Sequence, residues 1–116
     1  MIDKDIPGWL VNACRQMEKP ENIKGGIPAF VKLSGKTQEH LTRTLKKHYH
    51  TTPSDFINTL RLSDASRLLR ITFLPVSEII YMTGFENPSY FYRQFKLKFG
   101  MSPKRFRQLN NSIVNR

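Results

Sequence analysis

The chain repeats its own chemistry at an interval of fifty residues. Seven positions of segment 41–56 match segment 91–106, apolar with apolar, basic with basic and proline with proline. The matched pairs include Arg43 with Arg93 and Pro53 with Pro103. A glycine stands shortly before each copy. A repeat of this length with matched chemistry means that one supersecondary unit was built twice.

Charge indicates what such a unit binds. Nineteen Lys and Arg residues against nine Asp and Glu residues give the chain a formal charge of +10. This excess implies an acidic partner, and nucleic acid and anionic membrane are the obvious candidates. A length of 116 residues fits one domain, or two small subdomains that share a core.

Cysteine content and hydropathy exclude several classes of protein. Cys14 is the only cysteine, so no internal disulfide and no cysteine-based zinc site can form. A single cysteine suits a reducing cytoplasm, where we expect the protein to be. The sequence has no apolar run of about 18 residues, and its N-terminus does not resemble a secretion signal.

Apolar residues recur at helical spacing along nearly the whole chain, which predicts an all-α fold of about seven helices. Prolines, glycines and capping residues set the expected boundaries. Pro20 and the Gly25–Gly26 pair should close the first helix and open a loop. Met82 should face inward, and the tail from Asn110 should be frayed. The expected helices span about 9–17, 27–33, 38–49, 53–70, 75–83, 88–99 and 103–109.

Each copy reads as a short helix, a glycine turn and a second helix with basic residues on its outer side, which is the layout of a helix-turn-helix. The alternative is an ordinary helical hairpin, which two copies and the charge disfavour. The sequence therefore predicts one bipartite DNA-binding domain over 1–116. Its first helix-turn-helix subdomain should cover 7–50, its linker helix 53–70 and its second subdomain 75–110.

The second helix of each copy is the candidate for reading bases. Such a helix fits the major groove, where base edges present distinguishable donors and acceptors. Arg43 and Arg93 can each reach guanine with a two-pronged contact. The residues expected to contact bases are Gln38, Glu39, Thr42, Arg43, Ser89, Tyr92 and Arg93. Those expected to contact phosphates, which add affinity without sequence choice, are Lys36, Lys46, Lys47, Lys96, Lys98, Lys104, Arg105 and Arg107.

The second copy also resembles the signature region of AraC/XylS-type bacterial transcription regulators. The residues that carry the resemblance are Ile79, Gly84, Phe85, Ser89, Tyr90, Phe91, Arg93, Phe95, Lys96, Phe99, Gly100, Ser102, Pro103 and Phe106. Upstream, the matching residues are Leu41, Arg43, Pro53, Arg61, Leu62, Ala65, Leu68 and Leu69. Segments 20–22 and 35–41 are weakly similar to regulators of chitobiose-type sugar operons.

The resemblance implies two helix-turn-helix subdomains joined by a long helix, with both recognition helices in successive major grooves of double-stranded DNA. It also implies a separate N-terminal effector or dimerisation domain, missing from this chain, and RNA polymerase as a further partner. One departure is His50, which stands where the first copy usually has glycine. We therefore expect that helix end to be shaped differently.

Other classes of function have less support. His40, His48 and His50 are spaced so that they do not form one ligand set, so we expect no metal, no cofactor and no enzymatic activity. Basic residues spread over several helices do not form the single amphipathic face of a membrane-surface helix. A basic RNA-binding or structural nucleic-acid-associated protein remains the alternative to a DNA-binding regulator.

Overall fold

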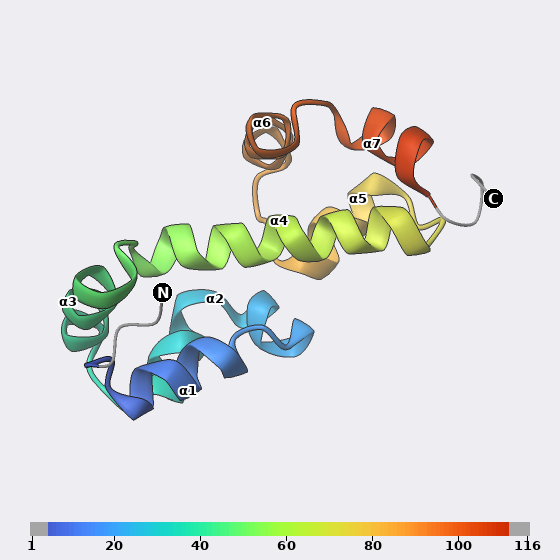
Figure 1. Ribbon diagram of the computed structural model, residues 1–116. Coiled ribbons are helices and arrows are strands. Elements are labelled where there is room, and N and C mark those ends of the chain that lie inside the picture. The colour runs from blue at the N-terminus through green and yellow to red at the C-terminus, as the bar shows by residue number, and fades with distance from the viewer. Residues whose placement is uncertain (1–4, 112–116) are drawn as a thin grey trace. The chain divides into compact units, whose positions relative to one another are not determined.

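The computed structural model describes residues 5–111, and every regular element in that range is an α-helix. The seven described helices, shown in Figure 1, confirm the predicted all-α fold. No helix in the described range is long and apolar enough to span a bilayer. In chain order the helices are α1 (Gly8–Gln16), α2 (Pro20–Ser34), α3 (Gln38–Tyr49), α4 (Pro53–Ile71), α5 (Val76–Thr83), α6 (Pro88–Phe99) and α7 (Pro103–Asn110).

The chain forms two compact units, and the division between them falls inside α4, between Leu60 and Arg61. Each unit has its own core because each helix buries one apolar stripe. The core of the first unit is made by Leu10, Ala13, Cys14, Met17, Phe30, Leu41, Leu45 and Ile57. The core of the second is made by Leu62, Ala65, Leu68, Leu69, Ile79, Ile80, Phe85, Phe91 and Phe95.

Helix α2 has two helical stretches, of which the second contains the predicted helix at 27–33 and the first, from Pro20, was predicted as a loop. Pro20 occupies its first position, where a proline lacks only an N–H that would have no helical partner. The expected loop at Gly25–Gly26 is instead a kink inside α2, with Gly26 at φ 68° and ψ −151°. The side chain of Asn22 donates a 2.8 Å hydrogen bond to the carbonyl of Gln16. This bond ties the start of α2 to the end of α1.

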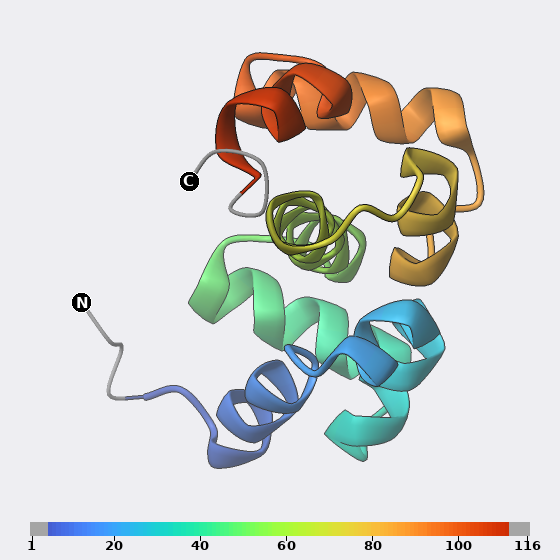
Figure 2. The ribbon, with the colours of Figure 1, turned by 90° about the vertical axis from the view of Figure 1, so that its right-hand side faces the viewer.

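Aromatic packing positions α6 in the second unit. The Phe95 ring centroid lies 4.5 Å from that of Phe99 and 5.5 Å from that of Phe106, which comes from α7. Phe91 and Phe95 are fully buried, as the helical spacing predicted. Figure 2 views α4 nearly end-on and shows α5, α6 and α7 around it. Met82, expected to face inward, is 41% exposed, since α5 buries Ile79, Ile80 and Thr83 instead.

The second unit closes on the C-terminal end of α4. Helix α7 runs to Asn110 and Asn111 is its C-cap, so the predicted fraying was wrong for these two residues, and the rest of the predicted tail, 112–116, lies outside the described range. Asn111 is fully buried. Its Nδ2 donates hydrogen bonds to the carbonyls of Leu69 and Thr72, each at 2.9 Å. These carbonyls have no partner within the helix, so the amide of Asn111 acts as a cap for α4.

The helix end at His50 has the same shape as its counterpart in the second unit. His50 adopts φ 57° and ψ 34°, close to the φ 74° and ψ 7° of Gly100. The N–H of His50 bonds to the carbonyl of Lys46, and that of Gly100 bonds to the carbonyl of Lys96. The expectation of a different shape was therefore wrong, because the left-handed conformation is kept although the residue is not glycine.

Replacing His50 with glycine should raise the free energy of unfolding by about 0.5–1 kcal/mol. Relief of left-handed strain exceeds the entropy that an extra glycine loses on folding. Urea denaturation followed by circular dichroism measures the change. The reciprocal variant Gly100→Ala should be destabilised by the strain of an alanine at a φ of 74°. An added β-carbon would meet no atom within 4 Å, so backbone strain is the only cost. Equal stability of His50→Gly and wild type would contradict the strain argument.

Candidate nucleic-acid interface

The two units contain similar turns and the same kind of helix start. Helices α2 and α5 end at the glycines with which the turns begin, Gly35 with φ 68° and Gly84 with φ 93°. Thr37 caps α3 by accepting a 3.1 Å hydrogen bond from the N–H of His40. Asn87 caps α6 by accepting a 3.1 Å hydrogen bond from the N–H of Tyr90. A side-chain cap fixes where a helix begins, so both second helices have a defined start, although Asn87 stands three residues after its glycine and Thr37 only two.

The outer face of α3 brings together the four base-contact candidates of the first copy. Leu41 and Leu45 are fully buried and define the inner face. Gln38, Glu39 and Arg43 are exposed and Thr42 is half-buried. All four line one open hollow on the surface. The prediction that they share a face follows from helical periodicity, and their contact with DNA stays a prediction.

The outer face of α6 carries Ser89, Tyr92 and Arg93, all exposed. It also carries Tyr90, which the prediction of base contacts left out. The guanidinium carbon of Arg93 lies 5.9 Å from the centroid of the Tyr90 ring. A cation over an aromatic ring is held by the ring's quadrupole, so Tyr90 restricts the directions available to Arg93. The signal in the sequence was the spacing of three residues, which places two side chains on one helix face.

Most of the phosphate-contact candidates are displayed on the surface. Lys36 is half-buried, and its Nζ lies 5.3 Å from the centroid of the Trp9 ring. The Trp9 ring also meets the ring of His40 edge to face, at 5.3 Å. Lys36 directly precedes the cap of α3 and so stands beside the candidate base-reading face. The exposed candidates are Lys46, Lys47, Lys96, Lys98, Lys104 and Arg105.

Arg107 differs from the other candidates. Its Nε donates a 3.3 Å hydrogen bond to the carbonyl of Leu69 at the end of α4. Its Nη2 is buried and has no hydrogen-bond partner among residues 5–111. Burial lowers the pKa of the Arg107 guanidinium from its ordinary value. We therefore assign Arg107 to the fold of the second unit and leave it out of the proposed interface.

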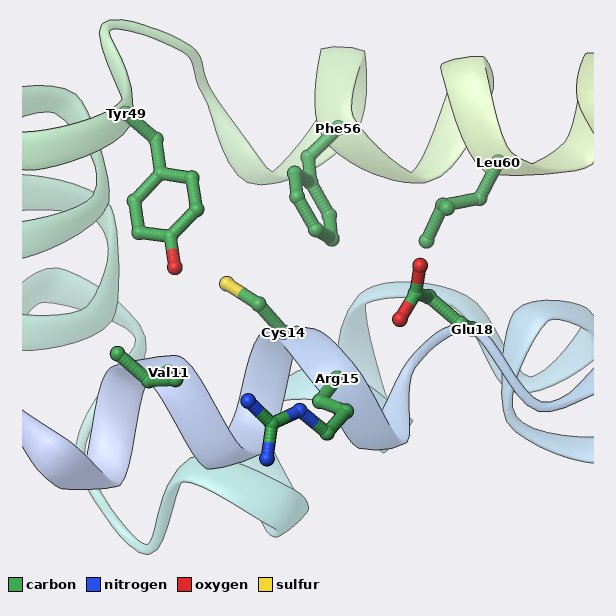
Figure 3. A pocket seen from close by; sticks show the side chains of 7 residues that line it. All are labelled: Val11, Cys14, Arg15, Glu18, Tyr49, Phe56 and Leu60. Atoms are coloured by element: carbon green, nitrogen blue, oxygen red, sulfur yellow. The ribbon is translucent and has the colours of Figure 1, made fainter. Parts of the chain in front are cut away.

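A separate hollow of about 300 Å³ in the first unit is lined by Cys14, Tyr49, Phe56 and their neighbours. In Figure 3 the thiol of Cys14 and the hydroxyl of Tyr49 point toward each other. Burial raises the pKa of Cys14 to about 11, although the hydrogen bond with Tyr49 opposes this shift. The thiol is therefore neutral and unreactive near pH 7, and Cys14 is a core residue as predicted. No group of three His, Cys, Asp or Glu side chains within residues 5–111 is placed to hold a metal ion.

Cys14 should react with iodoacetamide about 100-fold more slowly in the folded protein than in urea, because a pKa two units higher leaves that much less thiolate. Mass spectrometry of the alkylated protein measures the rate. The raised pKa also makes stability depend on pH. The contribution of Cys14 is full below pH 9 and is lost as pH rises toward 11. The stability difference between wild type and Cys14→Ala should shift accordingly, and an unchanged difference from pH 8 to 11 would contradict the assigned pKa.

Two capped helix-turn-helix units, each presenting an arginine on the outer face of its second helix, define a double helix-turn-helix DNA-binding domain. A family model described as "Helix-turn-helix domain" matches residues 31–109. The chain belongs to this family, in the AraC type of transcription regulators, which confirms the resemblance seen in the sequence. Sequence-specific DNA binding in transcription regulation is the function of this class.

Similar proteins agree with this assignment. The chain is 42% identical over 71 residues to the transcriptional regulator CdhR of Pseudomonas aeruginosa, an alignment that covers 61% of this chain and 21% of CdhR. It is 36% identical over 84 residues to the regulator GlxA of Rhizobium meliloti, covering 72% of this chain and 26% of GlxA. A crystal structure of an AraC-type regulator from Chromobacterium violaceum superposes with a TM-score of 0.74 at 26% identity, covering 86% of this chain and 89% of that one. The chain thus spans about a quarter of the length of these curated relatives.

Proposed function

We propose that α3 and α6 each enter the major groove of double-stranded DNA, in two successive turns, so that one chain reads a two-part, non-palindromic site. The observation that carries this proposal is the equivalence of Arg43 and Arg93. Each arginine stands six residues after its cap, Thr37 or Asn87, and each is exposed on the outer face of its helix. Two identical placements in one chain suit two similar contacts with a repeating duplex.

Base choice in this proposal comes from a few side chains of each helix. Arg43 and Arg93 would donate two hydrogen bonds to the O6 and N7 of a guanine. Glu39 would accept a hydrogen bond from the amino group of a cytosine. The remaining base contacts would come from Gln38, Thr42, Ser89 and Tyr92. The exposed lysines and Arg105 would supply affinity through phosphates, so binding should weaken steeply with salt.

Further parts of the function rest on the relatives. They are about three times as long as this chain, since the aligned 71 and 84 residues make up only 21% and 26% of them, which supports a separate effector or dimerisation domain in the whole regulator. Regulation of transcription by such a protein would involve contact with RNA polymerase in the cytoplasm.

Selection of bound DNA from a random library tests the proposed function. We expect an enriched site with two blocks whose centres lie about 10–11 base pairs apart, on one face of the duplex. Hydroxyl-radical footprinting of the selected site should show two protected patches at that interval. A single block, no enrichment, or preferential binding of RNA would contradict the proposal.

Arg93→Ala should cost about 1–3 kcal/mol on the selected site and relax the choice at one base pair. Lys98→Ala is the matched control, because Lys98 is exposed on the same helix. It should weaken all sequences alike and reduce the slope of log affinity against log salt by about 1. Fluorescence anisotropy with selected and scrambled duplexes measures both effects. An equal loss on both duplexes for Arg93→Ala would make Arg93 a phosphate contact only.

A further inference from the structure

The turn of the second helix-turn-helix is contacted by a side chain from α4. A β-carbon added to Gly84 would lie 3.0 Å from both Nε and Nη2 of Arg61, and 3.1 Å from its Cζ. Real β-carbons essentially never come closer than this to another heavy atom, so the guanidinium of Arg61 lies directly against the bare α-carbon of Gly84. Two features therefore favour glycine at position 84: its φ of 93° and the close approach of Arg61.

The same guanidinium lies next to the residue that leads into α6. The Cζ of Arg61 is 6.0 Å from the centroid of the Phe85 ring, and Phe85 is 8% exposed. The Phe85 ring in turn meets the ring of Phe91 edge to face, at 5.0 Å. Phe91 lies on the buried face of α6. A continuous set of contacts therefore runs from α4 through the turn to the candidate recognition helix.

Charge supports the same placement. Burial lowers the pKa of Arg61 from its ordinary value, and the carboxylate of Glu86 opposes that shift by favouring the charged guanidinium. Glu86 is the residue directly before the Asn87 cap of α6. Arg61 thus meets three consecutive residues of the turn, at 84, 85 and 86, through close contact, a cation–π approach and charge.

Among the residues that the structure describes, the first unit shows no equivalent contact. A β-carbon added to Gly35, the glycine of its turn, would meet no atom within 4 Å. Both glycines have positive φ, at 68° for Gly35 and 93° for Gly84, so backbone conformation does not separate them. The approach of an arginine does separate them. The second turn is held by a side chain from outside the motif, whereas the first turn is open at this position.

We propose that Arg61 is a positioning residue that sets the pose of α6 and so determines how strictly the second helix-turn-helix chooses bases. This inference rests on the proposed function, in which α6 reads one of the two blocks. A planar guanidinium can stack on Phe85 and lie flat on Gly84, whereas the ammonium of lysine is a compact charge without that shape. The shape of Arg61 should therefore matter beyond its charge.

Two substitutions at Arg61 and one control separate positioning from charge. Arg61→Lys keeps the charge and Arg61→Met removes it. Arg67→Met removes the same charge from the same helix, at a residue that pairs with Asp64 at 2.8 Å. Library selection with each variant gives the base choice in each block, titration gives the salt dependence, and thermal unfolding gives the stability. The block read by α6 is the one that Arg93→Ala relaxes.

Both Arg61 variants should reduce discrimination in the block read by α6 by roughly tenfold, which is about what one good base contact supplies. The other block and the salt slope should match those of wild type, as should every readout for Arg67→Met. Full rescue by Arg61→Lys, a lower salt slope, or equal loss in both blocks would overturn the inference. A wild type without a two-block site would instead overturn the proposed function itself.

A double-mutant cycle with Gly84 tests the contact without relying on Arg61 alone. Gly84→Ala should also relax the block read by α6, because its new β-carbon displaces the guanidinium. Combined with Arg61→Met, its effect on discrimination should be clearly less than additive, since both changes disrupt one contact. Gly35→Ala, with similar backbone strain and open space around it, should be additive with Arg61→Met. Additivity in both cycles would contradict the role of the contact.

Discussion

Replacing Phe95 with alanine should lower the free energy of unfolding of the second unit by about 3–5 kcal/mol, the usual cost of removing a buried phenylalanine. Phe95 is fully buried, and its ring centroid lies within 5.6 Å of those of Phe91, Phe99 and Phe106. Its loss leaves a cavity between α6 and α7 that the surrounding rings cannot fill without leaving their packed positions. Urea denaturation followed by circular dichroism measures the loss.

Phe73→Ala is the matched control for Phe95→Ala. Phe73 belongs to the same unit and is 63% exposed, so its replacement should change stability by no more than about 0.5 kcal/mol. Because Phe95 lies on the inner face of the candidate recognition helix, its loss should also reduce DNA affinity at temperatures where the first unit remains folded. A loss below about 1 kcal/mol for Phe95→Ala would mean that the aromatic cluster is not the core of this unit.

Replacing Asn111 with alanine should cost about 1–3 kcal/mol, a large effect for a polar residue just after the last helix. The change removes the amide that caps α4, so the carbonyl of Thr72 loses this donor, whereas the carbonyl of Leu69 keeps the 3.3 Å hydrogen bond from Arg107. An acceptor left without a partner costs more than the net value of the bond it lost. Thermal unfolding with calorimetry measures the loss.

Its neighbour Asn110 provides the control. The Asn110 side chain is exposed and bonds only locally, to the carbonyl of Phe106 at 2.8 Å. Asn110→Ala should therefore change stability by less than about 0.5 kcal/mol. Similar small effects for both asparagines would show that the cap on α4 is not needed. Because Arg107 also bonds to the carbonyl of Leu69, loss of both side chains should be less than additive.

The helix boundaries were largely predictable because their signals are local. Thr37 and Asn87 precede their helices directly, and each accepts a hydrogen bond from a residue three positions later. The interpretation of Pro20 as a helix end was wrong, because a local proline signal is ambiguous. A proline can follow the end of one helix or occupy the first position of the next. The predicted difference in helix shape at His50 was wrong because the preference for glycine at a positive φ is not absolute. A histidine can adopt the same φ at a cost in strain.

The outer faces of α3 and α6 were predictable from helical periodicity, whereas contacts between distant segments were not. Asn111 bonds to a carbonyl 42 residues earlier, and Arg61 meets a glycine 23 positions later. Nothing near Arg107 in the sequence distinguishes it from Arg105, yet one is exposed and the other lies on the end of α4. Helical periodicity in the sequence shows which side chains point away from the buried face of a helix. Tertiary packing decides which of these side chains stay exposed and can contact a ligand.

The setting of Trp9 has a practical consequence for following these variants. Trp9 is the only tryptophan in the chain, and it packs against Lys36 and His40 in the first unit. Its emission therefore reports on that half of the protein alone, whereas far-ultraviolet circular dichroism sums the helices of both. Melting curves recorded by the two methods should coincide for wild type if the halves unfold together, and should separate for Phe95→Ala if they do not.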